Sequence, residues 1–359
     1  MRVLNVKLSN EKYNIYIKRG LISDIGREIR GIYKGEKIAV ITDSNVQRIY
    51  GESFCLNLKK YGYKVKIITI KPGEESKSLE VAKNLYDKLL DFQISRGDLI
   101  ITLGGGVVGD LGGFVSSTLF RGISFIQIPT TLLAQIDSSI GGKVAVNLNR
   151  GKNLIGSFYH PKAVFIDPNV LKTLDKRFLY DGMAEAIKYS LISDKSLFER
   201  LNIYKDEKEL MYNIEDIIYN CCKIKKRIVE LDERDKNERM LLNFGHTIGH
   251  AIEKYFNYKN FTHGEGVAIG MYNITKKSEE MNITQKGTSD LIKKVLKNYN
   301  LPYKLNNMEK EKILKAITLD KKNIGKIINI ILLEKIGEGF VKKISKEEMK
   351  EFIDTKGVV

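Results

Sequence analysis

A length of 359 residues favours two domains of roughly 100 to 200 residues each over one compact core. Hydrophobic residues at 43% and charged residues at 29% exclude a disordered or membrane-embedded chain. A formal net charge of +16 suits a nucleic-acid binder, a membrane-surface protein, an enzyme with anionic substrates, or simply a lysine-rich chain. The basic residues are scattered, and the densest run, Lys223 to Arg227, lacks the interleaved aromatic residues that stack on bases. We therefore expect no nucleic-acid partner.

Cysteine usage and hydropathy predict a cytoplasmic protein. Cys55, Cys221 and Cys222 form an odd set without Cys-x-x-Cys spacing, which fits a reducing compartment. Residues 1–20 alternate apolar and polar side chains and have no signal-peptide core, and no apolar run approaches the roughly 18 residues needed to cross a bilayer. We expect neither export nor membrane anchoring.

The first half of the chain alternates strand-like and helix-like segments. Apolar runs bounded by turn residues predict strands at Arg2–Val6, Tyr13–Lys18, Lys37–Thr42, Tyr63–Ile70, Asp98–Leu103, Ser124–Ile128 and Ala163–Ile166. Helical periodicity predicts a helix over Ser78–Phe92. Strands and helices in alternation indicate an α/β domain with a mostly parallel sheet.

From about Leu171 onward the periodicity is helical, apart from the strand-like run Lys326–Leu333. We place a domain boundary near residue 175, which gives an α/β domain at 1–175 and a mainly α-helical domain at 176–359. No low-complexity linker or internal repeat separates them. A cleft between two such domains is the default place for a ligand.

A glycine-rich turn follows the strand Asp98–Leu103. The residues Gly104 to Gly109 satisfy G-x-G-x-x-G between a strand and a helix, and Asp110 follows them. Such glycines let backbone amides approach a pyrophosphate at the positive end of the helix, so dinucleotide binding is favoured over a purely structural turn. An ordinary Rossmann domain is not expected, because the turn follows about the fifth strand and no acid lies downstream in Ser116–Phe125. The acids that could hold a ribose, Asp43 and Glu74, lie upstream.

Three of the four histidines, His246, His250 and His263, lie close together in the sequence. His246 and His250 are four apart, and Arg239 and Asn243 lie upstream at spacings that keep the same helical register. Apolar neighbours indicate a buried segment, where polar groups without partners would be costly. Imidazoles with a carboxylate make a good zinc site, although core histidines remain the alternative. Spacing alone favours His246 and His250 as the ligand pair.

The remaining candidates are individually weak. Glu185 and Lys188 share a helical face, and from spacing alone an ordinary surface ion pair is the favoured interpretation. Lys143 follows a pair of glycines and Lys152 follows Gly151, so both lysines lie on glycine loops of the kind that approach anions. With Arg121, Lys225 and Arg239 they indicate a substrate that carries more than one negative group.

Read in order, these residues resemble the 3-dehydroquinate synthase family from about Asp43 to Gly337. The resemblance rests on TDSNV (42–46), PGEESKSLE (72–80), GGGVVGDLGGF (104–114), RGISFIQIPTTLLAQIDSSIGGKVAVNLNRGKNLIGSFYHP (121–161), GMAEAIKY (182–189), DERDKNERMLLNFGHTIGHAIE (232–253), HGEGVAIGM (263–271) and DKKNIGKIINIILLEKIG (320–337). No departure is evident where the family's motifs carry chemistry.

The resemblance implies an NAD-binding α/β domain at 1–175 and a helical metal- and substrate-binding domain at 176–359. It implies conversion of 3-deoxy-D-arabino-heptulosonate 7-phosphate to 3-dehydroquinate and phosphate, a lyase reaction of the shikimate pathway toward chorismate. The steps expected are transient oxidation by NAD, phosphate elimination, reduction, and intramolecular aldol closure. NAD is regenerated, and the divalent metal is zinc or cobalt.

The resemblance also implies site residues. NAD is expected to contact Asp43, Asn45, Gly73, Glu74, Lys77, Gly105, Gly106, Val107, Val108, Gly109, Asp110, Thr130, Thr131, Asp137, Lys143, Lys152, Val170, Leu171, Lys172 and Thr173. The catalytic and substrate-binding set is Arg121, Lys143, Asn153, Lys188, Lys225, Arg239, Asn243 and His250. Zinc is expected on Glu185, His246 and His263, which replaces the pair favoured by spacing and leaves His250 to contact substrate and move protons. Arg121 matches a position that reaches the neighbouring subunit's phosphate, which implies a homodimer, and one of Lys321 and Lys322 joins the phosphate site.

Three alternatives remain. A related cyclase such as a 2-deoxy-scyllo-inosose synthase shares the metal, cofactor and chemistry, but its substrate has no carboxylate to pair with Arg239. A metal-dependent alcohol or glycerol dehydrogenase would release reduced cofactor. A nucleic-acid-binding protein would bind in a strongly salt-dependent way and be indifferent to chelators.

Overall fold

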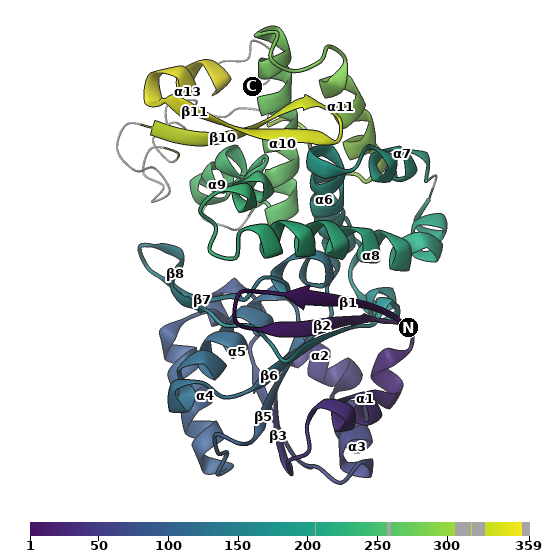
Figure 1. Ribbon diagram of the computed structural model, residues 1–359, viewed down its shortest axis with the longest axis vertical. Coiled ribbons are helices and arrows are strands. Elements are labelled where there is room, and N and C mark those ends of the chain that lie inside the picture. Colours follow the sequence, from purple (N-terminus) through teal and green to yellow (C-terminus); the bar gives the residue numbers. More distant parts are fainter. Residues whose placement is uncertain (205, 257–259, 306–316, 318–326, 354–359) are drawn as a thin grey trace. The chain divides into compact units, whose positions relative to one another are not determined.

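The computed structural model describes residues 1–204, 206–256, 260–305, 317 and 327–353. Internal contacts divide the chain into two compact units, Met1–Leu174 and Asp175–Val359. In Figure 1 the first unit runs from purple to teal and the second from teal to yellow.

A seven-stranded sheet with the order β1-β2-β9-β6-β5-β3-β4 forms the centre of the first unit. Its strands are β1 (Arg2–Lys7), β2 (Lys12–Ile17), β3 (Lys37–Asp43), β4 (Lys64–Ile70), β5 (Leu99–Gly104), β6 (Phe125–Pro129) and β9 (Ala163–Ile166). Only the β1–β2 pair of this sheet is antiparallel. The predicted α/β fold with a mostly parallel sheet is confirmed.

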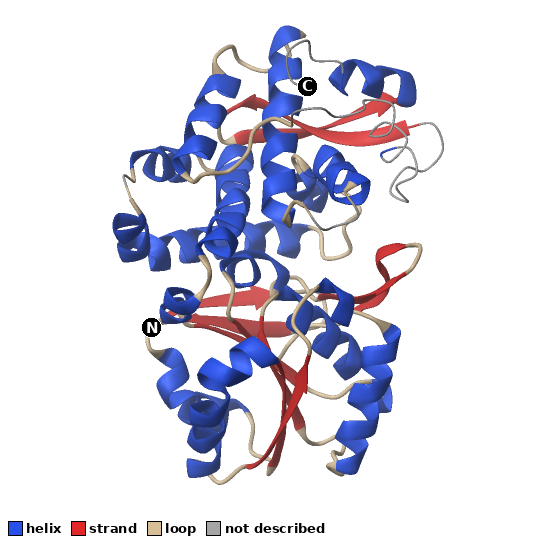
Figure 2. Ribbon diagram, turned by 180° about the vertical axis from the view of Figure 1, so that it is seen from behind, coloured by secondary structure: helices blue, strands red, loops and turns tan. Residues whose placement is uncertain are grey.

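Helices cover both faces of this sheet (Figures 1 and 2). One face carries α1 (Ile25–Ile32) and α3 (Glu52–Lys60), and the other carries α4 (Leu79–Asp91) and α5 (Gly106–Thr118). Short helical segments connect these elements: η1 (Leu21–Asp24), α2 (Ser44–Val46), η2 (Gln47–Gly51), η3 (Glu74–Ser76), η4 (Leu119–Arg121), η5 (Ala134–Ser138) and η6 (Pro168–Thr173).

Strand β3 shows why the sheet needs helices on both sides. Its residues are apolar in succession, and side chains of a strand alternate between the two faces. Ile38 and Val40 pack in the cluster with α1 and α3, whereas Ala39 and Ile41 pack in the cluster with α4 and α5. A strand that is buried on both faces is the usual constituent of a parallel sheet.

The hairpin of β7 (Lys143–Leu148) and β8 (Gly151–Phe158) was not predicted. Its second strand is only partly buried and contains two glycines, so the apolar pattern that identifies a strand is weak. The loop prediction for Lys143 and Lys152 is wrong, because both lysines lie within these paired strands.

The second unit is mainly helical, as predicted. Its helices are α6 (Lys176–Ser193), α7 (Lys195–Ile203), α8 (Glu207–Leu231), η7 (Glu238–Asn243), α9 (His246–Tyr255), α10 (His263–Glu280), α11 (Thr288–Asn298) and α13 (Lys346–Ile353), and β10 (Ile327–Lys335) pairs with β11 (Glu338–Ser345). Strand β11 was not predicted, since its residues are mostly polar and half-exposed.

No helix within the described part of the chain is both long and apolar enough to span a bilayer.

Two pairs of glycines let α9 and α10 approach closely. A Cβ on Gly270 would lie 2.0 Å from the carbonyl oxygen of Gly245, and a Cβ on Gly249 would lie 2.9 Å from the backbone of Gly266. The glycines are four residues apart in each segment, so they lie on one face of each helix. Only residues without a side chain allow this approach, which brings the start of α9 against α10.

We expect Gly270→Ala to destabilise the protein by about 1–3 kcal/mol or more, because the new methyl group has no space against the backbone of Gly245. Gly31→Ala is the matched control. It lies exposed in α1 with nothing within 4 Å of its Cβ position, and should be neutral or stabilise by up to about 1 kcal/mol. Denaturant unfolding measures both, and equal effects would contradict the close helix contact.

Candidate active site

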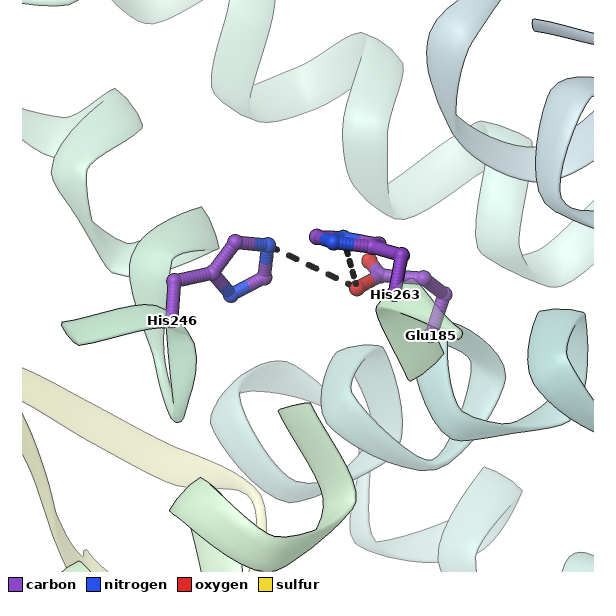
Figure 3. A group of neighbouring side chains, drawn as sticks. All are labelled: Glu185, His246 and His263. Atoms are coloured by element: carbon purple, nitrogen blue, oxygen red, sulfur yellow. Dashed lines mark ion pairs between the residues drawn. The ribbon is translucent and has the colours of Figure 1, made fainter. Parts of the chain in front are cut away.

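Helices α6, α9 and α10 each contribute one side chain to a cluster in the second unit: Glu185, His246 and His263. Figure 3 shows both imidazole rings directed at the carboxylate of Glu185. The Nε2 atoms of His246 and His263 each lie 3.6 Å from Oε1 of Glu185. Their potential ligand atoms all lie within 4.8 Å of one another.

This geometry fits a divalent metal ion. Ligands about 2.1 Å from a tetrahedral zinc lie about 3.4 Å apart, close to the observed separation. Oε1 of Glu185 is buried, has no hydrogen-bond partner and faces the Nε2 atoms of both histidines, an arrangement that a cation would relieve. Nδ1 of His246 lies 3.0 Å from the carbonyl oxygen of Phe244, which can only accept, so the proton sits on Nδ1 and Nε2 keeps its lone pair.

Lys188 also neutralises Glu185. The two side chains form an ion pair within α6 and are 1% and 0% exposed. The interpretation of this pair as a surface ion pair is therefore wrong. The two residues do share a face of α6, but the helix is buried on every side around them. Removing one partner of a buried ion pair leaves the other charge buried and uncompensated, which is strongly unfavourable.

His246 and His263 have opposite electrostatic environments. Burial, with the positive charge of Lys188 and the neighbouring histidines, lowers the pKa of His246 well below that of free imidazole. Burial also opposes charge on His263, but Glu185 and Glu253 outweigh it and raise its pKa well above the usual value. His246 is therefore neutral, and His263 must release a proton when a cation binds.

The first turn of α10 is fixed from several directions, and this positions His263 at its start. Thr262 and Glu265 form a capping box, and Arg177 makes a two-pronged ion pair with Glu265 at 2.8 Å for each contact. Oδ1 of Asp181, on α6 one turn before Glu185, accepts the N–H of Gly264 at 2.5 Å. Asp181, Arg177 and Glu265 were not singled out from the sequence, because their partners are distant in the chain.

Three predicted substrate residues of the second unit lie on α8 and η7. Lys225 and Arg239 are 5% and 2% exposed, and Asn243 is half-buried. The predicted continuous helical face from Arg239 to His250 is wrong. Gly245 has φ 77 and separates η7 from α9, so Arg239 and Asn243 belong to a different element from the histidines.

Asp232 organises the loop before Arg239. Its carboxylate accepts the backbone N–H groups of Lys236, Asn237 and Arg239 at 3.0, 2.6 and 3.1 Å. Although burial opposes the charge, these hydrogen bonds hold the pKa of Asp232 below its ordinary value. The ionised carboxylate thus fixes the backbone from which the Arg239 side chain extends.

His250 lies beside both His246 and His263. Its ring centroid is 5.3 Å from that of His246 and 5.8 Å from that of His263. A second possible metal group consists of His250, Glu253 and His263. The structure therefore brings all three clustered histidines together but leaves two ligand sets to compare.

In the first unit, the predicted NAD residues follow the carboxyl ends of parallel strands. Asp43 ends β3, Glu74 follows β4, Gly105 follows β5, Thr130 follows β6, and Val170 follows β9. These ends meet at one edge of the sheet. From β3 the chain continues to β4 on one side and later to β5 on the other, so this edge has the switch in strand order at which α/β sheets bind ligands.

A polar network joins several of these residues. Lys77 forms an ion pair with Asp110 and donates to Oδ1 of Asn153 at 2.6 Å. Glu74 accepts a hydrogen bond from Asn147 at 2.7 Å, and its Oε1 lies 4.0 Å from Nζ of Lys152. Residues predicted from separate motifs are thus brought together around the strand ends.

The glycines of the turn have distinct roles. Gly105 is the N-cap of α5 and its cap has no side-chain hydrogen bond. A Cβ on Gly109 would lie 2.8 Å from Oε1 of Gln127 on β6, so this glycine allows close packing of the helix on the sheet. Asp43 similarly acts as a cap, because its Oδ1 accepts the N–H groups of Asn45 and Val46 at 2.8 and 3.1 Å.

The remaining predicted residues are placed as follows: Gly73 before η3, Val107 and Val108 in α5, Thr131 after β6, Asp137 in η5, Leu171, Lys172 and Thr173 in η6, and Arg121 at the end of η4. Arg121 is exposed and has φ 63. Lys321 and Lys322 lie outside the described residues.

Comparison with known proteins identifies the family. The family models "3-dehydroquinate synthase N-terminal" and "3-dehydroquinate synthase C-terminal" match residues 67–181 and 182–323. The 3-dehydroquinate synthase of Clostridium acetobutylicum is 55% identical over 98% of this chain and 99% of its own, and that of Enterococcus faecalis is 45% identical over 99% of each.

Solved structures share the fold. A 2-deoxy-scyllo-inosose synthase bound to carbaglucose-6-phosphate, NAD⁺ and Co²⁺ has a TM-score of 0.87 at 26% identity, covering 98% of this chain and 99% of that one. A 2-epi-5-epi-valiolone synthase from Streptomyces hygroscopicus with NAD⁺ and Zn²⁺ has a TM-score of 0.88 at 22% identity, covering 98% of each.

These findings confirm the prediction that the protein is an enzyme with 3-dehydroquinate synthase function. The chain is 55% identical to a 3-dehydroquinate synthase but 26% identical to the 2-deoxy-scyllo-inosose synthase, and this difference favours the first of these two cyclases. The chain belongs to the 3-dehydroquinate synthase family.

Proposed function

We propose that this enzyme converts 3-deoxy-D-arabino-heptulosonate 7-phosphate to 3-dehydroquinate and phosphate with NAD and one divalent metal ion. The observation that carries the proposal is the buried carboxylate of Glu185 with two imidazole nitrogens at 3.6 Å. The related structures with NAD⁺ and Co²⁺ or Zn²⁺ support it.

Glu185, His246 and His263 would hold the metal ion, and two imidazoles with a carboxylate accept either zinc or cobalt. When bound, the metal ion polarises a substrate hydroxyl and NAD takes up and returns a hydride. His246 contributes an unprotonated Nε2, because its Nδ1–H is donated to the carbonyl oxygen of Phe244. Lys188 balances the charge of Glu185 and limits the net charge of the site.

NAD would bind at the carboxyl edge of the first unit's sheet. The first-turn amides of α5, beginning after Gly105, would receive the pyrophosphate. Glu74 would accept hydrogen bonds from ribose hydroxyls, and Lys152 beside it would hold it in place. Asp43, Thr130 and the segment Val170–Thr173 follow neighbouring strands at the same edge.

The buried cations Lys225 and Arg239 suit a substrate with a carboxylate and a phosphate. A guanidinium matches the two oxygens of a carboxylate, and a lysine stabilises the charge of departing phosphate. His250, beside the ligand histidines, is placed to hold or move a substrate proton. The substrate contacts of Lys143 and Asn153 in the first unit, and of Asn243 in the second, stay predictions.

The homodimer implied by Arg121 and the cytoplasmic location both stay predictions. Exposure of Arg121 is compatible with a role toward a second subunit. Sedimentation velocity on the wild type and Arg121→Ala measures assembly, and phosphate release by the same proteins measures catalysis. Together they separate a defect in assembly from a defect in catalysis.

Glu185→Ala should lower turnover by about 100-fold or more, because a metal ligand is lost and Lys188 is left buried without its carboxylate. Turnover is followed as phosphate released from the heptulosonate phosphate, together with the absorbance of reduced nicotinamide. Wild type should release phosphate without net NADH, and a chelator should abolish the release. Glu199→Ala, at a side chain 64% exposed, is the control and should match wild type. Net NADH without phosphate would instead identify a dehydrogenase.

Glu74→Ala should weaken NAD binding about 10- to 100-fold, because one charge-assisted hydrogen bond is worth about 1.5–3 kcal/mol. The neighbouring Glu75→Ala is the control. The side chain of Glu75 is 86% exposed, and its ion pair with Lys71 is long, at 3.9 Å. Calorimetric titration with NAD measures both. Equal affinities for the two variants would argue against Glu74 as the ribose acceptor.

A further inference from the structure

A second buried carboxylate lies next to the metal cluster. Glu253 is on α9, seven residues after His246 and three after His250, so it shares their helical face. It is 5% exposed. Nothing in the sequence pattern connects it with His263, which begins a different helix.

The ring of His263 lies between two carboxylates. Its Nε2 is 3.6 Å from Oε1 of Glu185, and its Nδ1 is 3.7 Å from Oε1 of Glu253. A neutral imidazole binds a metal ion through one nitrogen and carries its proton on the other. If Nε2 faces the metal ion, the Nδ1–H is directed at Glu253.

His246 shows the same arrangement with a different acceptor. Its Nδ1 contacts the carbonyl oxygen of Phe244 at 3.0 Å and its Nε2 faces Glu185. Both histidines therefore present Nε2 to the same carboxylate oxygen and Nδ1 to an oxygen acceptor. Such acceptors fix the tautomer and orientation of metal-binding histidines.

We propose that Glu253 is a positioning residue that accepts the Nδ1–H of His263 and holds its Nε2 toward the metal ion. This inference rests on the metal ion proposed above. The 3.7 Å separation exceeds the usual hydrogen-bond length of about 3.0 Å, so the contact is an ion-pair approach in this structure.

The other ligand set, His250, Glu253 and His263, makes Glu253 a ligand instead. That set does not include Glu185, and Nδ1 of His263, which lies 3.7 Å from Oε1 of Glu253, would be the nitrogen that it uses. Oε1 of Glu185, which is buried and faces the Nε2 atoms of both His246 and His263, would then have neither a hydrogen bond nor a metal ion. The burial of Glu185 thus favours a positioning role for Glu253.

The test is the zinc dissociation constant of the full-length protein, measured by competition with a chromogenic chelator. Glu253→Ala should weaken zinc binding about 10- to 100-fold, the usual effect of removing such an acceptor. Glu253→Gln keeps an oxygen acceptor and should bind with intermediate affinity. Glu199→Ala, at an exposed glutamate, should match wild type. Thermal unfolding of the metal-free proteins identifies any variant that is misfolded.

Cobalt substitution distinguishes positioning from ligation. The visible spectrum of bound Co²⁺ should keep its shape in Glu253→Gln, because the ligand atoms are unchanged. If the Co²⁺ spectrum of Glu253→Gln differs in shape from that of wild type, as it would after a ligand is lost, the proposal is overturned and the second ligand set is supported. Unchanged zinc affinity in folded Glu253→Ala would also overturn it.

Failure of this inference is separable from failure of the proposed function. Wild type that binds zinc, with loss of binding in Glu185→Ala, supports the metal site whatever Glu253 does. Wild type that binds neither zinc nor cobalt would overturn both proposals.

Discussion

The burial of Glu185 is the constraint on which the second unit depends. A carboxylate with no exposed surface needs partners for its charge, and the structure supplies the ammonium group of Lys188 on the same helix and the imidazole rings of two histidines from other helices. Bringing those histidines within 3.6 Å requires α9 and α10 to approach almost backbone to backbone, which the glycine pairs allow. The hydrogen bond of Asp181 to the start of α10 then sets the position of His263. Fold and chemistry thus share the same contacts.

The first unit places its chemistry by a simpler rule. Because its strands are parallel, residues that are distant in sequence end at one edge of the sheet. The network of Lys77, Asp110 and Asn153 then links the glycine turn to the β7–β8 hairpin. A dinucleotide at this edge would meet the first-turn amides of α5, the carboxylate of Glu74 and the ammonium group of Lys152.

Sequence patterns predict those parts whose environment is uniform. Strand β3 has four consecutive apolar residues, Ile38–Ile41, because both its faces are buried, and its bounds were predicted to within one residue. Strands β8 and β11 have half-exposed faces and gave no clear pattern. Spacing suggested one helix from Arg239 to His250, since the register continues across Gly245 although the chain does not. The burial of Lys188 and the approach of Glu253 to His263 depend on tertiary packing, so spacing could not find them.

The most direct test of this account is the position of the metal ion, measured by anomalous diffraction at the zinc edge from crystals of the zinc-loaded protein. The account predicts one strong peak bound by a carboxylate oxygen of Glu185 and by Nε2 of His246 and of His263, with Glu253 outside the coordination shell. A peak bound instead by His250, Glu253 and Nδ1 of His263 would contradict it.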